Sequence, residues 1–87
     1  MAERIEQYSS LIEDENGVSY KVEACGDTTP SGLWKGWLEF YPLESNLPVL
    51  RTERETTQPN RKALEYWATG LEPIYFEGAF ERAHVKQ

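Results

Sequence analysis

The sequence predicts an α+β domain of two layers, in which a meandering antiparallel sheet of about five strands carries one helix on one face. Three observations predict this class: runs of alternating apolar and polar residues fill most of the chain before Thr57, clusters of turn-forming residues separate these runs, and one later segment has apolar residues at helical spacing. The expected order is β-β-β-β-α-β. The 87 residues suffice for one small domain, residues 1–87, with frayed ends expected at 1–4 and 85–87.

The first two strands are predicted to form a hairpin around the turn Asp14-Glu15-Asn16-Gly17. A type I turn with Gly17 in the left-handed conformation gives a three-residue loop, which sets Ile12 opposite Tyr20 and Tyr8 opposite Ala24. The alternative is a two-residue loop at Asn16-Gly17, which would set Leu11 against Val22. We prefer the longer loop because it collects six residues on one face: Tyr8, Ile12, Val18, Tyr20, Val22 and Ala24.

A second hairpin is predicted from Leu33–Tyr41 and Val49–Thr57. A register that sets Glu39 opposite Arg51 also sets Lys35 opposite Glu55, which gives two favourable cross-strand charge pairs. The same register sets Phe40 opposite Leu50 and Gly36 opposite Arg54. The first of the two segments then has one face suited to a core, with Trp34, Gly36, Leu38 and Phe40, and an outward face with Lys35, Trp37, Glu39 and Tyr41.

One helix is predicted to follow these strands. The segment Thr56-Thr57-Gln58-Pro59-Asn60 supplies its start, with proline near the first turn, and Gly70 lies just past its end. Residues at i, i+3, i+4 and i+7 predict a buried stripe of Leu64, Trp67, Ala68 and Leu71.

The segment after Pro73 is predicted to be the last strand, because Ile74, Phe76, Gly78 and Phe80 alternate with Tyr75, Glu77, Ala79 and Glu81. A C-terminal helix through Ala79 to His84 is the alternative. A single helix of about a dozen residues, at 1.5 Å rise each, spans only ~18 Å and cannot cover both faces of the sheet. We therefore expect one face to be solvated or to meet a partner.

Composition argues against several functions. Nine Lys and Arg against fifteen Asp and Glu give a net charge of −6, which disfavours binding to duplex nucleic acid. No segment approaches the ~18 consecutive apolar residues of a membrane span, and the N-terminus has no apolar stretch of signal-peptide length. The single Cys25 cannot form an intrachain disulfide, which fits a reducing compartment. These features predict a cytoplasmic protein that does not enter a membrane.

The outward face of the second hairpin is the first candidate binding surface. Large amphipathic aromatic residues are over-represented in protein interfaces, and here they lie among charges on a face that no predicted helix covers. The candidate residues are Lys35, Trp37, Tyr41, Arg51 and Tyr75. They predict a small non-enzymatic interaction module that binds a protein partner or forms a homodimer. The alternative is that the aromatic rings only stack on neighbouring charged side chains and cover the sheet.

The start of the helix is the second candidate site, for a small anion. Hydroxyl, amide and cationic groups gather there around exposed backbone N–H groups: Arg54, Thr57, Asn60 and Arg61. Such a site would hold phosphate or a carboxylate, or support a minor enzymatic activity. Ordinary helix capping explains the same residues, and Pro59 removes one of the N–H donors.

No residue pattern predicts a catalytic triad, a metal cluster or a cofactor. We expect Glu53 and Glu55 to pair with cations, His84 to be solvated near the chain end and Cys25 to be an inert thiol. Binding of single-stranded nucleic acid through stacked aromatic rings is a further possibility, against which the acidic fourth strand argues.

Several segments resemble a group of short bacterial proteins of unknown function: Trp34–Phe40, Arg54–Asn60, Tyr66–Pro73 and Glu77–Ala79. The resemblance covers residues 17–83. It implies a bacterial cytosolic source, and it assigns no activity, cofactor or site residue.

Overall fold

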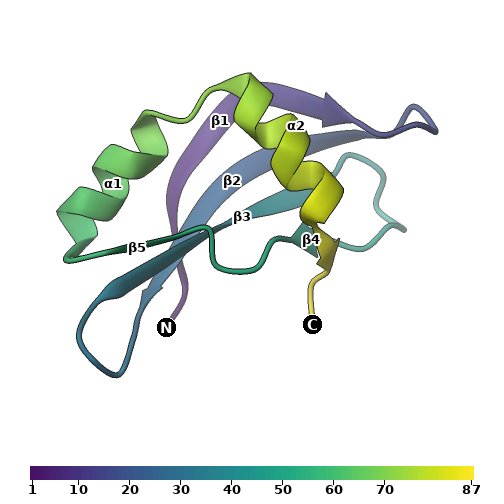
Figure 1. Ribbon diagram of the computed structural model, residues 1–87. Coiled ribbons are helices and arrows are strands. Elements are labelled where there is room, and N and C mark those ends of the chain that lie inside the picture. The colour runs from purple at the N-terminus through teal and green to yellow at the C-terminus, as the bar shows by residue number, and fades with distance from the viewer.

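The structure is a computed structural model that describes residues 1–87, and it confirms an α+β domain built on an open antiparallel sheet. Two helices lie on one side of the sheet (Figure 1). The elements in chain order are β1 (Glu3–Glu13), β2 (Ser19–Thr28), β3 (Trp34–Pro42), β4 (Leu50–Arg51), β5 (Thr56–Gln58), α1 (Arg61–Thr69), α2 (Pro73–Arg82) and β6 (His84–Val85). The strands are arranged in the order β1-β2-β3-β4-β6, and β5 pairs with β3.

The first hairpin has the predicted three-residue loop. The Asp14 N–H donates to the Val18 carbonyl at 2.9 Å, Gly17 has a φ of +83°, and Ile12 lies opposite Tyr20. Farther from the loop the register shifts, so that Glu6 lies opposite Ala24 and the predicted pair of Tyr8 with Ala24 is wrong. A bulge between Gln7 and Leu11 causes the shift.

Tyr8 still reaches the core despite this shift. Its hydroxyl donates to the Ala68 carbonyl of α1 at 2.6 Å, and its ring lies 4.5 Å from that of Phe76, between centroids. Leu11, which the predicted loop left without a place, is 52% exposed on β1. Since β1 is the first strand in the sheet order, its outer edge has no neighbouring strand.

The second hairpin follows the predicted register only near its loop. Glu39 pairs with Arg51 as expected, but Lys35 pairs with Thr57, so the predicted pair of Lys35 with Glu55 is wrong. The chain departs from β3 at Thr52, whose hydroxyl accepts from the Leu38 N–H at 3.1 Å and whose side chain is fully buried. Residues 52–55 form no ladder pair, and β5 resumes the pairing two positions later than predicted.

Gly36 makes room for α1, and not for Arg54 as predicted. A Cβ atom at Gly36 would lie 2.6 Å from Cδ1 of Leu64, and one at the neighbouring Gly26 would collide with Cδ2 of the same leucine. The predicted helix is confirmed, with the Asn60 side chain accepting from the Ala63 N–H at 2.8 Å at its start. Leu64 and Ala68 of the predicted stripe are fully buried.

The predicted last strand at 74–83 is wrong, because this segment forms the helix α2. Phe76, Ala79 and Phe80 recur at i, i+3 and i+4, and Pro73 occupies the first turn, where its missing N–H costs nothing. Phe76 and Ala79 are buried, whereas Ile74 is 77% exposed, which is the pattern of a helix and not of an alternating strand. The alternative helix, through Ala79 to His84, had the right type but began too late.

The end of the chain returns to the sheet as β6. Val85 pairs with Leu50 of β4, and the Lys86 N–H donates to the Val49 carbonyl at 2.8 Å. The two helices, which lie one after the other along the sheet, still cover only one of its faces (Figure 1). We call the uncovered side the open face. It carries Cys25, Trp37, Glu39 and Tyr41, whose neighbours along each strand point toward the helices.

Candidate functional site: the open face of the sheet

Trp37 lies on the open face, as predicted, but the expectation that its ring is available for contact is wrong. The side chain is only 3% exposed. The guanidinium of Arg51 lies 4.4 Å from the ring centroid and the ammonium of Lys35 lies 5.9 Å from it. These cations are attracted to the face of the indole and cover it, so a partner would touch Arg51 and Lys35 before Trp37.

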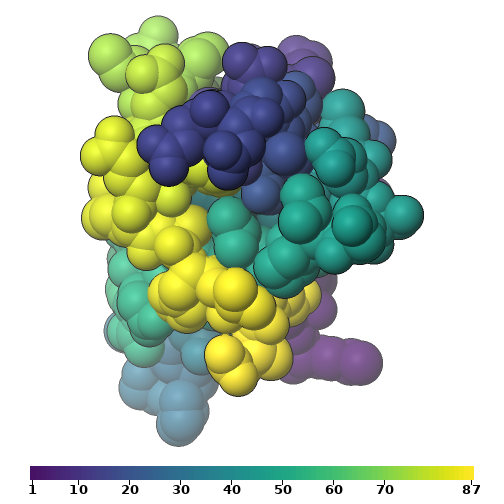
Figure 2. Space-filling view, turned by 90° about the vertical axis from the view of Figure 1, so that its right-hand side faces the viewer, coloured from purple at the N-terminus to yellow at the C-terminus, as the bar shows by residue number.

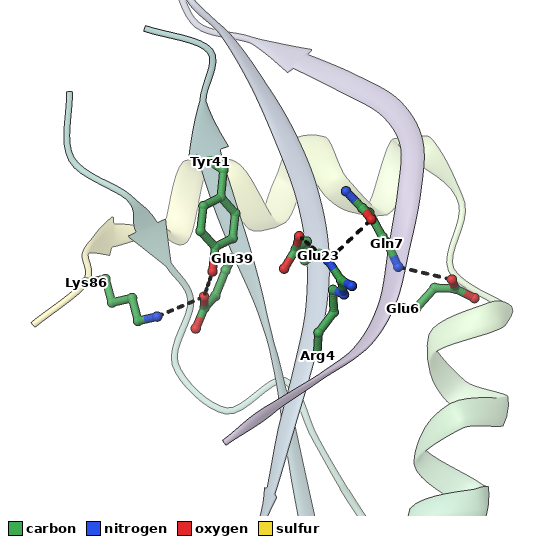
Figure 3. Close-up of polar contacts among 7 residues, drawn as sticks. All are labelled: Arg4, Glu6, Gln7, Glu23, Glu39, Tyr41 and Lys86. Carbon is green, nitrogen blue, oxygen red and sulfur yellow. Dashed lines mark hydrogen bonds and ion pairs between the residues drawn. The ribbon is translucent and has the colours of Figure 1, made fainter. Parts of the chain in front are cut away.

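Glu39 is a buried carboxylate at the centre of this face. It accepts hydrogen bonds from Nε1 of Trp37 at 2.8 Å, from the hydroxyl of Tyr41 at 2.5 Å and from Nζ of Lys86 at 3.1 Å. Figure 3 shows Tyr41 of β3 and Lys86, which follows β6, converging on this carboxylate. Its side chain is 3% exposed, so these three donors replace the water that it lacks.

The same contacts determine the protonation state of Glu39. Burial raises the pKa of this carboxyl, but the hydrogen bonds from Trp37, Tyr41 and Lys86 outweigh burial and hold the pKa below its usual value. Burial, with the hydrogen bond to Glu39, raises the pKa of Tyr41. Glu39 is therefore ionised and Tyr41 protonated at neutral pH.

Cys25 lines a small cavity of about 140 Å³ beside Glu39. Burial, together with the nearby charges of Glu39 and Glu23, raises the pKa of this thiol to about 12. The thiol is therefore protonated at neutral pH and poorly suited to act as a nucleophile. The other residues that line the cavity are Ala2, Glu3, Arg4, Glu23, Tyr41 and Lys86.

Two carboxylates face each other across β2 and β3, since Glu23 lies directly opposite Glu39. Like charges in this position destabilise a sheet unless cations compensate them. Arg4 of β1 lies 3.4 Å from Glu23, and Lys86 compensates Glu39 (Figure 3). Segments from both ends of the chain therefore complete the site.

The open face collects cations in a protein that is acidic as a whole. Five of the nine Lys and Arg side chains belong to it: Arg4, Lys21, Lys35, Arg51 and Lys86. Arg4 and Lys86 are paired with carboxylates, whereas Lys21, Lys35 and Arg51 take part in no ion pair. The unpaired cations surround Trp37 and Tyr41 and are available to an acidic group from outside.

Tyr75 does not belong to the open face. It lies on α2, where its hydroxyl donates to Glu55, and Arg82 binds the same carboxylate at 2.5 Å. These contacts attach α2 to the bulge that follows β4, and burial together with Glu55 raises the pKa of Tyr75 to about 12. Its expected role on the sheet face fails because Tyr75 lies in the helix α2, Pro73–Arg82, and not in a strand.

The four residues of the predicted anion site make contacts within the protein. Arg61 pairs with Glu3 at 2.7 Å and with Glu65, and the Asn60 side chain caps α1. Arg54 donates to the hydroxyl of Thr57 at 3.2 Å. Since these contacts occupy the groups that an anion would use, ordinary capping accounts for the arrangement, and the anion site stays a prediction.

His84 lies at the rim of the open face, where Nε2 is 2.6 Å from the carboxylate of Glu53. Both side chains are exposed. No group of three His, Cys, Asp or Glu side chains is arranged to hold a metal ion.

Sequence reasoning missed the central role of Glu39 and the part of Lys86. The spacing Trp37-x-Glu39-x-Tyr41 on one strand places two donors beside one acid on the same face, and this signal was available. Lys86 lies far from Glu39 in sequence, and no local pattern connects them.

Fold and site together define a small α+β domain in which one face of the sheet is polar and only some of its charges are paired. Comparison with protein-family models, with curated proteins and with solved structures found no match for this chain. Neither helix is long and apolar enough to cross a membrane.

Proposed function

We propose that this protein is a small non-enzymatic interaction module whose open face binds an acidic surface on a partner protein. The observation that carries the proposal is the group of unpaired cations, Lys21, Lys35 and Arg51, on a sheet face that neither helix covers. We also place the protein in the cytoplasm of a bacterium, on the single unpaired Cys25 and on the resemblance of its segments to short bacterial proteins.

The geometry around Trp37 suits recognition of a carboxylate. Arg51 is held in a fixed position by stacking on the indole, and a guanidinium presents a rigid fork of donors to a carboxylate. An acidic side chain that pairs with Arg51 would lose little binding energy to ordering of the arginine, because the stacking has already ordered it. Tyr41 offers an adjacent half-buried ring.

The same charges argue for a different protein as partner and against a symmetric homodimer. In a two-fold dimer formed by this face, the same patch of each copy meets itself. Lys21, Lys35 and Arg51 of one copy would then approach the same cations of the other, and like charges across an interface are unfavourable. An acidic partner avoids this repulsion.

Two other functions fit the site less well. Glu39 is held ionised and Cys25 is held protonated, so neither is poised for acid-base or nucleophilic chemistry near neutral pH. Stacking of single-stranded bases requires exposed rings, and Trp37 is covered by Arg51 and Lys35.

A pair of double variants with equal charge changes tests the proposal. Lys21→Glu with Lys35→Glu alters the open face, and Arg54→Glu with Lys62→Glu alters two unpaired cations outside it. A photo-crosslinking group at position 43, in the exposed loop after β3, would capture the partner in cells, and mass spectrometry would identify it.

We expect the yield of crosslinked partner to fall at least tenfold in the open-face variant and to stay unchanged in the control variant. The reason is that the open-face changes replace an attractive charge by a repulsive one at two positions. Sedimentation over a range of concentrations should show a monomer. Equal loss in both variants, no crosslinked protein, or a concentration-dependent dimer abolished by the open-face changes would each overturn the proposal.

A further inference from the structure

A second surface, opposite in charge to the open face, lies where the tip of the first hairpin meets α2. Figure 2 looks onto this end of the molecule and shows the hairpin tip, in dark blue, against α2, in yellow. Two cavities of about 350 and 450 Å³ adjoin here and share Glu13, Phe80 and Glu81. We call the two together the acidic groove.

The floor of the groove is apolar and rigid. Phe80 is half-buried, and its ring centroid lies 5.0 Å from that of Tyr20 and 5.1 Å from that of Phe40, so the core fixes its orientation. Ile12 and Leu50 line the groove on either side, and Leu11 at its end is 52% exposed. An apolar side chain from outside could therefore bury surface against Phe80 without rearrangement of the core.

The rim of the groove carries uncompensated negative charge. Glu13, Glu15, Glu77 and Glu81 take part in no ion pair, and no Lys or Arg lines either cavity. Arg82, the cation nearest in sequence to Glu81, is directed to Glu55. Asp14, by contrast, already accepts the N–H groups of Asn16 and Val18 within the turn, each at 2.9 Å.

We propose that the acidic groove binds a basic segment of a protein, in which an apolar side chain covers Phe80 and flanking Lys or Arg side chains pair with the glutamates of the rim. Charge complementarity identifies this occupant, because four unpaired carboxylates around an apolar floor repel one another until cations lie between them. The two adjoining cavities also give room for several residues, and a small polyamine has no side chain for the apolar floor. The end of the groove borders the open face, since Leu11 lies opposite Lys21, but binding in the groove does not require the acidic partner proposed for that face.

Titration of the purified protein with synthetic peptides tests the proposal. The probe is a peptide of alternating Lys and Leu, observed through the backbone amide signals of the protein. Two comparison peptides carry Glu in place of Lys or Ser in place of Leu, and spermidine serves as the small cation. We expect the Lys-Leu peptide to shift amides of residues 11–16 and 77–81, and expect both comparison peptides to bind at least tenfold more weakly.

Two double variants locate the binding. Glu13→Gln with Glu81→Gln removes two charges from the rim. It should lower the affinity for the Lys-Leu peptide by roughly three- to tenfold, as expected for the loss of two exposed ion pairs. The control Glu53→Gln with Glu72→Gln removes two exposed charges outside the groove and should leave the affinity unchanged. Equal weakening in both variants, amide shifts outside the groove, or spermidine binding as tightly as the peptide would overturn the proposal.

Discussion

Two aromatic residues of β3, Phe40 and Trp37, are almost completely buried on opposite faces of the same sheet, and they are buried in different ways. Phe40 is covered by α2, whose Phe80 meets it edge to face at 5.1 Å. Trp37 is covered by the side chains of Arg51 and Lys35, and its N–H is bonded to Glu39. The helix face therefore depends on the packing of whole elements, whereas the open face depends on individual polar side chains.

This difference indicates how a surface without helices can be both ordered and available. The cations that stack on the indole are held in place by it and still belong to no ion pair, so they stay available to a partner. Removal of a helix from its apolar face would unfold a domain of this size. The open face can therefore stay ordered and available while the helix face holds the fold.

The largest expected effect is on the helix face, with Leu64→Ala. Leu64 of α1 is fully buried against Gly26 and Gly36 of the sheet. Truncation of its side chain leaves a cavity that the backbone cannot fill. We expect a loss of about 2–5 kcal/mol in the free energy of unfolding, measured by chemical denaturation.

The control for this prediction is Tyr66→Ala on the same helix, because the Tyr66 side chain is 84% exposed. Its effect should stay within about 0.5 kcal/mol. If Leu64→Ala cost no more than Tyr66→Ala, α1 would not be packed on the sheet as the structure has it.

The next effect belongs to the open face, with Glu39→Gln. The amide cannot accept three charge-assisted hydrogen bonds as the carboxylate does, so we expect a loss of about 1–3 kcal/mol at pH 7. Chemical denaturation at a series of pH values measures it. Asp27→Asn is the comparison, because this carboxylate is 25% exposed and bonded only to the N-terminal ammonium and the Thr28 N–H, and it should cost less stability than Glu39→Gln.

The sign of the pH dependence follows from the lowered pKa of Glu39. The folded protein binds a proton to this group less readily than the unfolded chain does, so the stabilisation is complete above the unfolded pKa of about 4.3 and is lost as the pH falls through the folded pKa. The difference in stability between the wild type and Glu39→Gln should therefore narrow as the pH falls below about 4. A constant difference across this range would show that Glu39 is not held ionised by its neighbours.

Elements whose pattern is local could be predicted from the sequence. The hairpin loop at residues 14–17 and the helix ended by Gly70 depend on turn and capping residues within a few positions, and both are confirmed. The segment 73–82 could not be assigned, because Phe76 and Phe80 satisfy a period of two and a helical period equally. Only the core decides, since the helix turns Ala79 inward beside Phe76.

The site was predictable in position but not in exposure. Trp37 and Tyr41 do lie on the face without helices, as the alternation along β3 requires. The side chains that cover them could not be predicted. Whether Arg51 extends into solvent or folds over the indole of Trp37 depends on its rotamer. Lys86, which pairs with Glu39 beside them, comes from the far end of the chain. The break in pairing at residues 52–55 could not be predicted either, because it depends on a contact between distant residues: the Thr52 hydroxyl accepts a hydrogen bond from the Leu38 N–H.

The smallest expected effect on stability is also the sharpest test of how Trp37 is covered. In a background of Trp34→Phe and Trp67→Phe, Trp37 is the only indole, and quenching of its fluorescence by acrylamide reports its exposure. Arg51→Ala should raise this quenching several-fold while lowering the free energy of unfolding by only about 0.5–1 kcal/mol.

Leu64→Ala in the same background should show the reverse, with a large loss of stability and quenching of the folded state unchanged, because Leu64 lies on the other side of the sheet. Lys62→Ala removes a cation from α1 and should change neither quantity. If Arg51→Ala left Trp37 protected, the cover of the indole would not come from that guanidinium, and the open face would have no ordered arginine to offer an acidic partner. Together, the opposite outcomes for Arg51 and Leu64 would establish that the two faces of one sheet are stabilised independently.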